Sequence, residues 1–100
     1  MSKCSEEYVY EITVQDDEIY YTKGLFRTFE EAEKIILEWD ADCSIGDNDD
    51  YDEIIKIEKR KLGVICECIG VTVARYRREN KYDEEKDENY FVTTVLERHV

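Results

Sequence analysis

Proline is absent from this sequence of 100 residues, glycine occurs four times and histidine once. These shortages exclude proline-rich recognition segments, collagen-like repeats and glycine-rich linkers. The one histidine, His99, lies next to the carboxyl end, so the chain has no Ser-His-Asp or Cys-His pair of the kind that nucleophilic catalysis needs. No glycine-rich loop is available to cradle phosphate. We therefore expect a protein without enzymatic activity.

Long hydrophobic runs are missing as well. No run approaches the roughly 20 apolar residues of a membrane span, and Glu6 and Glu7 stand where a signal peptide would need an apolar stretch. The sequence thus predicts a cytoplasmic protein that binds no membrane. In that compartment the four cysteines are expected to be reduced thiols that bind no metal or other cofactor: Cys4, Cys43, Cys66 and Cys68.

Basic residues are scarce, with 14 Lys and Arg against 26 Asp and Glu, which leaves a net charge of −12. Direct binding of nucleic acid is disfavoured, because affinity for phosphate comes from clustered Lys and Arg. The first fifty residues hold 15 acidic and 4 basic side chains, against 11 and 10 in the last fifty, and such an acidic pole attracts a basic partner. With 42% apolar residues the chain can form one core, and we expect a single domain over residues 1–100.

Two segments near the amino terminus have the pattern of strands. Every second residue from Tyr8 to Val14 is apolar or aromatic, a period of two that is typical of a strand with one buried face. Residues 19–26 are again rich in β-branched and aromatic side chains, and the polar residues 15–18 can turn the chain. The two segments therefore predict an antiparallel hairpin.

A helix is expected near residues 29–40. Thr28 and Glu31 have the Thr-x-x-Glu spacing of a helix start, in which hydroxyl and carboxylate each satisfy a free backbone donor. Steps of three and four residues then place four apolar side chains on one stripe, which we expect to pack against a sheet with the tryptophan in the core: Phe29, Ala32, Ile36 and Trp39.

The second half of the chain predicts three more strands. Residues 54–61 and 63–77 are rich in β-branched side chains around a short turn, and residues 90–99 resume the pattern. Residues 79–88, with eight charged side chains and no aliphatic one, are expected to form an exposed loop, and Gly70 to mark a bulge. The order β-β-α-β-β-β predicts an α+β domain, an antiparallel sheet of about five strands with one helix packed on a face. One helix covers only part of such a sheet, so its other face is expected to be open.

Residues 38–53 hold eight acidic side chains and no basic one, and we expect a solvated acidic loop there. Calcium requires about six to eight oxygen ligands, and an EF-hand count from Asp42 puts Glu53 at the twelfth place. The sixth place, which requires glycine, holds Asp47, and a strand is expected where an EF-hand has its second helix. A cation-binding regulatory domain is therefore a second alternative to the main interpretation.

The density of carboxylates favours a protein that binds a basic surface. Side chains two apart on an extended segment are about 6.7 Å apart, so alternate aspartates present charges in a row, as the phosphates of a nucleic acid do. The partner predicted is a basic nucleic-acid-binding protein or ribonucleoprotein. The predicted contact residues are four aspartates, a tyrosine anchor and the closing glutamate: Asp47, Asp49, Asp50, Tyr51, Asp52 and Glu53.

Arg75 and Arg77 fall on one face of their predicted strand, and Arg78 follows them. Three basic side chains in so acidic a chain attract nucleic acid weakly, and we expect them to pair with carboxylates of residues 83–87 or with an acidic patch on a second subunit.

The open sheet face or the strand over residues 90–99 supports an alternative function, a structural or assembly module that forms homo-oligomers.

Residues 24–34, GLFRTFEEAEK, resemble a strand-to-helix junction that is common in small phage and bacterial domains of unassigned role. In size, acidity and lack of a catalytic motif, the whole chain resembles the small inhibitors that bacteriophages encode against host defence, notably anti-CRISPR proteins and DNA mimics. The resemblance implies an inhibitor that acts in the host cytoplasm and blocks the basic nucleic-acid-binding surface of a host nuclease or defence complex. It transfers no functional residue.

Overall fold

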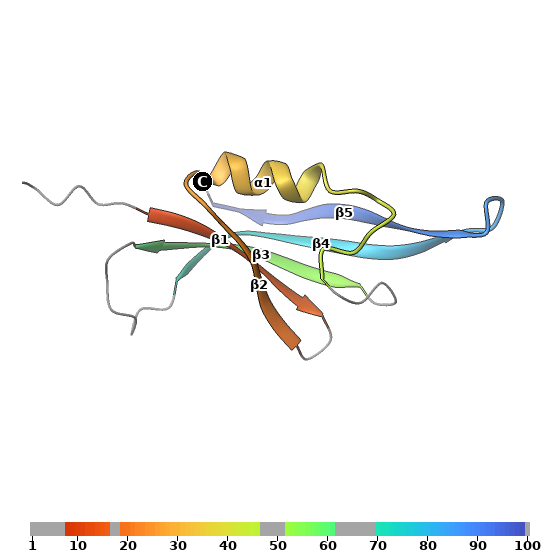
Figure 1. The fold of residues 1–100 in the computed structure, drawn as a ribbon, viewed down its shortest axis with the longest axis horizontal. Helices are drawn as coiled ribbons and strands as arrows, with labels where there is room; N and C mark the ends of the chain where they lie inside the picture. The colour runs from red at the N-terminus through yellow and green to blue at the C-terminus, as the bar shows by residue number, and fades with distance from the viewer. Residues whose placement is uncertain (1–7, 17–18, 47–51, 62–69, 100) are drawn as a thin grey trace, which may run out of the picture.

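The fold belongs to the α+β class, as the sequence predicts. A computed structural model describes residues 8–16, 19–46, 52–61 and 70–99, which form one five-stranded antiparallel sheet and one helix (Figure 1). The order of elements matches the predicted β-β-α-β-β-β. The elements are β1 Tyr8–Asp16, β2 Ile19–Phe26, α1 Phe29–Leu37, β3 Glu53–Lys61, β4 Val71–Asp83 and β5 Glu88–Arg98.

The strand order in the sheet is β2-β1-β3-β4-β5, and all neighbouring strands are antiparallel. β1 and β2 form the hairpin expected from their alternation. The chain then passes through α1, and β3 returns on the other side of β1. β2 and β5 are therefore the two edges of the sheet, and β3 lies at its centre.

The hydrophobic core forms around the central strands. The register brings Val14, Ile55 and Tyr76 side by side, and all three side chains are fully buried. Complete burial of an aliphatic side chain stabilises a fold by about 1.5–3 kcal/mol, so these rows contribute much of the stability. The same buried cluster extends along the strands and includes residues of α1: Ile12, Ile57, Ala74, Phe29, Ala32 and Ile36.

The helix begins where the sequence predicts and ends earlier. Thr28 is the N-cap, and its Oγ1 accepts a hydrogen bond from the Glu31 N–H at 3.2 Å. The last helical residue is Leu37, because Glu38 leaves the helical conformation with φ −98° and ψ 7° and the Trp39 indole N–H donates to the Ser44 carbonyl at 3.2 Å. The Trp39 side chain is 39% exposed, so the prediction that it lies in the core is wrong.

The β4–β5 hairpin is longer than expected. Residues 79–83 continue β4, and β5 begins at Glu88, so most of the loop predicted over residues 79–88 is strand. A ladder of backbone hydrogen bonds does not require apolar side chains, and charged residues extend the hairpin beyond the helix (Figure 1). Asp83 Oδ1 closes the turn by accepting hydrogen bonds from the N–H groups of Glu85 and Lys86.

Gly70 precedes β4 and is not itself the bulge. The register of β3 and β4 shifts between Ile57 and Glu58, which leaves Val73 without an opposite residue in β3. A Cβ atom at position 70 would lie 2.8 Å from Cγ of Arg60, so glycine permits the close approach of these two segments. Residues 63–69 of the predicted strand lie outside the described residues.

Within the described ranges, α1 is the one helix, and it is neither long nor apolar enough to cross a membrane. Cys43 carries a free, exposed thiol. The remaining cysteines lie outside the described residues: Cys4, Cys66 and Cys68.

Candidate partner-binding site

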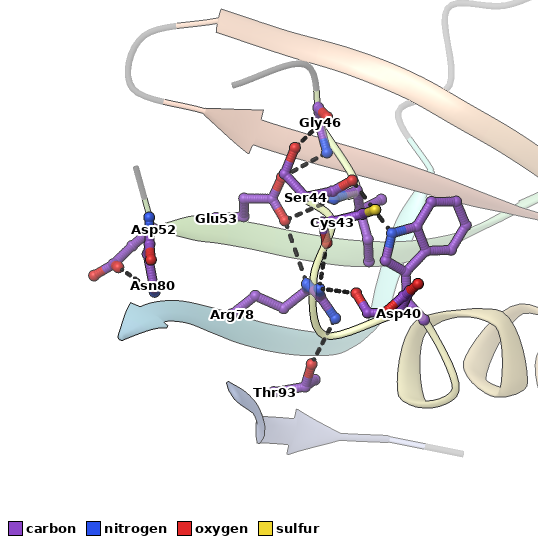
Figure 2. Close-up of polar contacts among 11 residues, drawn as sticks. Asp40, Cys43, Ser44, Gly46, Asp52, Glu53, Arg78, Asn80 and Thr93 are labelled. Carbon is purple, nitrogen blue, oxygen red and sulfur yellow. Dashed lines mark hydrogen bonds and ion pairs between the residues drawn. The ribbon is translucent and has the colours of Figure 1, made fainter. Parts of the chain in front are cut away.

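A buried ion pair joins the centre of the sheet to the acidic segment. Glu53 at the start of β3 and Arg78 in β4 are opposite each other in the ladder. Glu53 is 0% exposed and Arg78 is 1% exposed. Arg78 Nε lies 3.4 Å from Glu53 Oε2 (Figure 2). Burial lowers the pKa of the Arg78 guanidinium, and the Glu53 carboxylate acts in the opposite direction.

The Arg78 guanidinium also holds the chain that follows α1. Its Nη2 donates to the carbonyl oxygens of Asp40 at 3.1 Å and of Cys43 at 2.7 Å, and its Nη1 donates to Thr93 Oγ1 of β5 at 3.1 Å (Figure 2). The guanidinium carbon lies 5.0 Å from the centre of the Phe91 ring. One side chain thus connects β4, β5 and the loop.

The Glu53 carboxylate holds the other end of the same loop. Its Oε2 accepts from the Ile45 N–H at 3.1 Å and its Oε1 from the Gly46 N–H at 2.5 Å. A carboxylate that accepts two backbone N–H groups and faces a guanidinium is well satisfied, which is the condition for burying it. Residues 38–46, held between Arg78 and Glu53, are called the anchored loop below.

Two further contacts fix the middle of the anchored loop. The Phe91 N–H of β5 donates to the Ala41 carbonyl at 2.8 Å, and Ser44 Oγ donates to the Gly46 carbonyl at 2.6 Å. Together with the contacts of Arg78 and Glu53, these hydrogen bonds join the loop to β3, β4 and β5. The backbone is therefore not free to rearrange without breaking buried hydrogen bonds.

The acidic side chains of the anchored loop are exposed. Glu38, Asp40 and Asp42 all face solvent, while the backbone carbonyl of Asp40 faces Arg78. Asp40 Oδ1 accepts from the Asp42 N–H at 3.0 Å. Lys34 Nζ lies 3.9 Å from Glu38 Oε2, but both side chains are mostly exposed, so this pair contributes little. The loop therefore presents three carboxylates on a fixed backbone.

The structure divides the contact residues predicted from the sequence. Glu53 is wrong as a surface contact, because its carboxylate is fully buried and holds the loop. Asp52 is exposed, but its two oxygens accept from the Asn80 N–H at 2.9 Å and from Arg77 Nη2 at 3.2 Å. The other four lie outside the described residues: Asp47, Asp49, Asp50 and Tyr51.

The contacts of Asp52 affect its protonation. The hydrogen bond from the Asn80 N–H holds the pKa of the Asp52 carboxyl below its ordinary value of 3.8, and Arg77 adds to this effect. Asp52 therefore ties β3 to β4 as a carboxylate.

A second polar cluster joins α1 to β4 and β5, with Tyr76 and Glu33 buried and Arg98 partly exposed. The Tyr76 hydroxyl donates to Glu33 Oε2 at 2.6 Å, and Arg98 Nη2 donates to Glu33 Oε1 at 2.5 Å. Burial and the contact with Glu33 raise the pKa of the Tyr76 hydroxyl above its ordinary value of 10.0. This cluster links α1 to β4 and β5, and we assign it a structural role.

The two exposed arginines of β4 pair with other partners than expected. Arg75 Nε lies 3.1 Å from Glu97 of β5, and Arg77 Nη2 lies 3.2 Å from Asp52. The pairing predicted with residues 83–87 is therefore wrong for both. Arg78 points to the opposite face and is buried, which its position two residues after Tyr76 in a strand could have indicated.

Within the described residues, no group of three or more His, Cys, Asp or Glu side chains lies close enough together to hold a metal ion. Of the residues in the EF-hand count, Asp42 is exposed and Glu53 is buried in its ion pair. Asp47 lies outside the described residues.

Comparison of the chain with protein-family models, with curated proteins and with solved structures finds no match.

Proposed function

We propose that the protein is a non-enzymatic binding protein whose anchored loop occupies a basic surface of a nucleic-acid-binding protein or ribonucleoprotein. A phage-encoded inhibitor of host defence, of the anti-CRISPR or DNA-mimic type, would act in this way. The observation that carries the proposal is the Arg78–Glu53 pair, because it fixes the backbone from which three exposed carboxylates project.

A fixed loop binds better than a mobile one of the same charge. Ordering a residue of backbone costs about 1–2 kcal/mol of conformational entropy, and a loop that is ordered before binding avoids much of that loss on association. The anchored loop is ordered by hydrogen bonds to β3, β4 and β5, so its carboxylates meet a partner in a preset arrangement.

The charge of the chain suits a basic partner. A net charge of −12 produces a field that raises the rate of encounter with a positive surface, most strongly at low salt. Ions at physiological strength screen exposed charges beyond about 8 Å. The exposed side chains of Glu38, Asp40 and Asp42 can then contribute through close contact.

In this proposal, α1 and the anchored loop together form a layer on one face of the sheet, and the other face stays open. Phe29 and Ile36 of α1 share a buried cluster with Ile45 of the loop. The layer places the loop's carboxylates on the helix side of the molecule.

The proposal is tested with two variants that lose the same number of carboxylates. The loop variant neutralises the anchored loop: Glu38→Gln, Asp40→Asn and Asp42→Asn. The turn variant neutralises exposed residues of the β4–β5 hairpin end, beyond the helix (Figure 1): Glu84→Gln, Glu85→Gln and Glu88→Gln. Both variants have the same net charge, so a difference between them reports on position.

Each variant and the parent are used to capture proteins from bacterial lysate at low and at high salt. We expect the parent and the turn variant to retain a basic nucleic-acid-binding protein at low salt and to release it at high salt, whereas the loop variant retains much less. Equal capture by all three proteins, or capture of nothing basic, would contradict the proposal.

A second function, assembly through homo-oligomers, is favoured by the edge strand β5. Val92, Val95 and Leu96 are 38%, 45% and 51% exposed. At the edge of β5 the Phe91 N–H is bonded to the Ala41 carbonyl, and the exposed part of an edge strand can pair with another strand. Sedimentation velocity distinguishes this function: a dimer that persists at high salt and is lost on Leu96→Lys would support it, and a monomer would exclude it.

A further inference from the structure

A hollow beside the anchored loop exposes the one tryptophan of the chain. The hollow has a volume of about 330 Å³ and is lined by Lys34, Ile35, Glu38, Trp39, Asp40 and Cys43. Ile35 and Trp39 are 40% and 39% exposed. Large apolar side chains this exposed at a concave site are typical of a binding surface.

The exposure of Trp39 is built into the loop. Its Nε1 donates to the Ser44 carbonyl at 3.2 Å, and Ser44 is itself buried and bonded to the Gly46 carbonyl. The indole ring is therefore held by the anchored loop and does not turn into the core. Its accessible surface remains available to a ligand.

The charges beside the hollow select the ligand. Glu38 and Asp40 line it and are exposed, and Asp42 follows them on the loop. The one cation in the lining, Lys34, lies 3.9 Å from Glu38. An apolar wall with an aromatic ring, beside an excess of carboxylates, is complementary to a flat cation with an aliphatic stem.

We infer that this hollow binds an arginine side chain of the basic partner. The guanidinium lies against the Trp39 ring and pairs with the carboxylates of Glu38 and Asp40, while its methylene stem covers Ile35. Guanidinium is planar and weakly hydrated and stacks on aromatic rings, whereas the ammonium of lysine is compact and strongly hydrated. The inference rests on the proposed function and specifies which partner side chain the site takes.

Trp39 is the only tryptophan of the chain, so its fluorescence reports directly on the hollow. The probes are an oligoarginine and an oligolysine peptide of equal length, titrated into the parent at equal ionic strength. We expect both peptides to bind. The contact of one guanidinium with the Trp39 ring should make the arginine peptide bind about 2- to 5-fold more tightly than the lysine peptide. Only the arginine peptide is expected to change Trp39 emission in a saturable way.

Variants separate this site from general attraction between charges. Trp39→Leu should keep most of the binding measured by anisotropy of a labelled peptide but lose the preference for arginine. Trp39→Phe, which keeps an aromatic ring, should retain part of that preference. Thermal unfolding of each variant checks that the domain is folded. If the Leu variant is unfolded, the Phe variant still tests the preference for arginine.

A pair of carboxylate variants completes the test. Glu38→Gln with Asp40→Asn should weaken the arginine peptide more than the matched pair Glu84→Gln with Glu85→Gln. Equal binding of both peptides with equal change in Trp39 emission overturns the arginine site and leaves the proposed function standing. If Trp39 emission changes with protein concentration in the absence of peptide, a second copy of the chain occupies the hollow, and the arginine site is overturned as well. Failure of both peptides to bind contradicts the proposed function itself.

Discussion

Replacement of Arg78 by methionine tests the ion pair on which the anchored loop depends. The change removes three hydrogen bonds, to the carbonyls of Asp40 and Cys43 and to Thr93 Oγ1, and leaves the fully buried Glu53 carboxylate without a counter-ion. Removing one partner of a buried pair costs about 3–5 kcal/mol, because the remaining charge stays buried and uncompensated. We expect a loss of stability in that range.

The loss is measured by urea and thermal unfolding, followed by far-UV circular dichroism for the sheet and by Trp39 fluorescence for the loop. For a domain of this size each kcal/mol lowers the melting temperature by about 4–8 °C, so a decrease of at least about 12 °C is expected. We also expect Trp39 fluorescence to change before the dichroism does, because the loop loses its anchor first.

The neighbouring arginine provides the control. Arg77 precedes Arg78 in β4, but its side chain is 48% exposed and its partner Asp52 is 45% exposed. Exposed pairs of this kind contribute about 1 kcal/mol or less, so Arg77→Met should have a small effect. If Arg78→Met were no more destabilising than Arg77→Met, the anchoring role of the buried pair would be refuted.

Tyr76, Asp52 and the cysteines each provide a further test. Tyr76→Phe removes the hydrogen bond to Glu33 and should lower the free energy of unfolding in urea by about 1–3 kcal/mol. The pKa of Tyr76 is raised in the folded state, so the stability that its hydroxyl contributes is present below pH 10.0 and is lost as pH rises above that value. The difference in stability between the parent and the variant should therefore be smaller at high pH. The lowered pKa of Asp52 gives a contribution that is present above pH 3.8 and is lost as pH falls through the folded-state pKa; Asp52→Asn should therefore flatten the acid limb of the stability curve, and an unchanged limb would contradict this. Thiol titration under denaturing, non-reducing conditions should find four free groups, whereas fewer groups or stoichiometric zinc would overturn the expectation of reduced cysteines.

Local patterns are sufficient to predict β1 and the start of α1. The alternation from Tyr8 to Val14 and the spacing of Thr28 and Glu31 depend on neighbours in the chain, and β1 and the start of α1 appear where these patterns place them. The end of α1 was missed because Trp39 fits the helical stripe by spacing alone. Its hydrogen bond to Ser44, within a loop, decides its position instead.

The site was harder to predict because its contacts join distant residues. By composition Glu53 is one of eight acidic side chains in residues 38–53, but its alternation with Ile55 and Ile57 places it on the core side of β3. Arg78 shares the buried face of β4 with Tyr76 in the same way. The pattern of either strand alone predicts a buried charge without a partner. Only the register of β3 against β4, which places Glu53 opposite Arg78, shows that the two charges neutralise each other.

The β4–β5 hairpin shows the opposite limitation. Residues 79–88 contain no aliphatic side chain, so hydrophobic periodicity carries no strand signal there. The backbone ladder nevertheless continues, with Lys81 opposite Tyr90 and Asp83 opposite Glu88. Exposed strands that extend a hairpin are held by backbone pairing, and a pattern of burial does not detect them.

The role of the anchored loop as a contact surface is decided by the rate at which the partner captured at low salt associates with the loop variant and with the turn variant. Both variants carry the same net charge, so steering by the overall field is matched between them. If the anchored loop is the contact surface, the partner should associate with the loop variant about 10-fold or more slowly than with the turn variant at low salt. This difference should become smaller as the salt concentration rises. Equal rates for the two variants at every salt concentration would show that the partner binds elsewhere on the molecule.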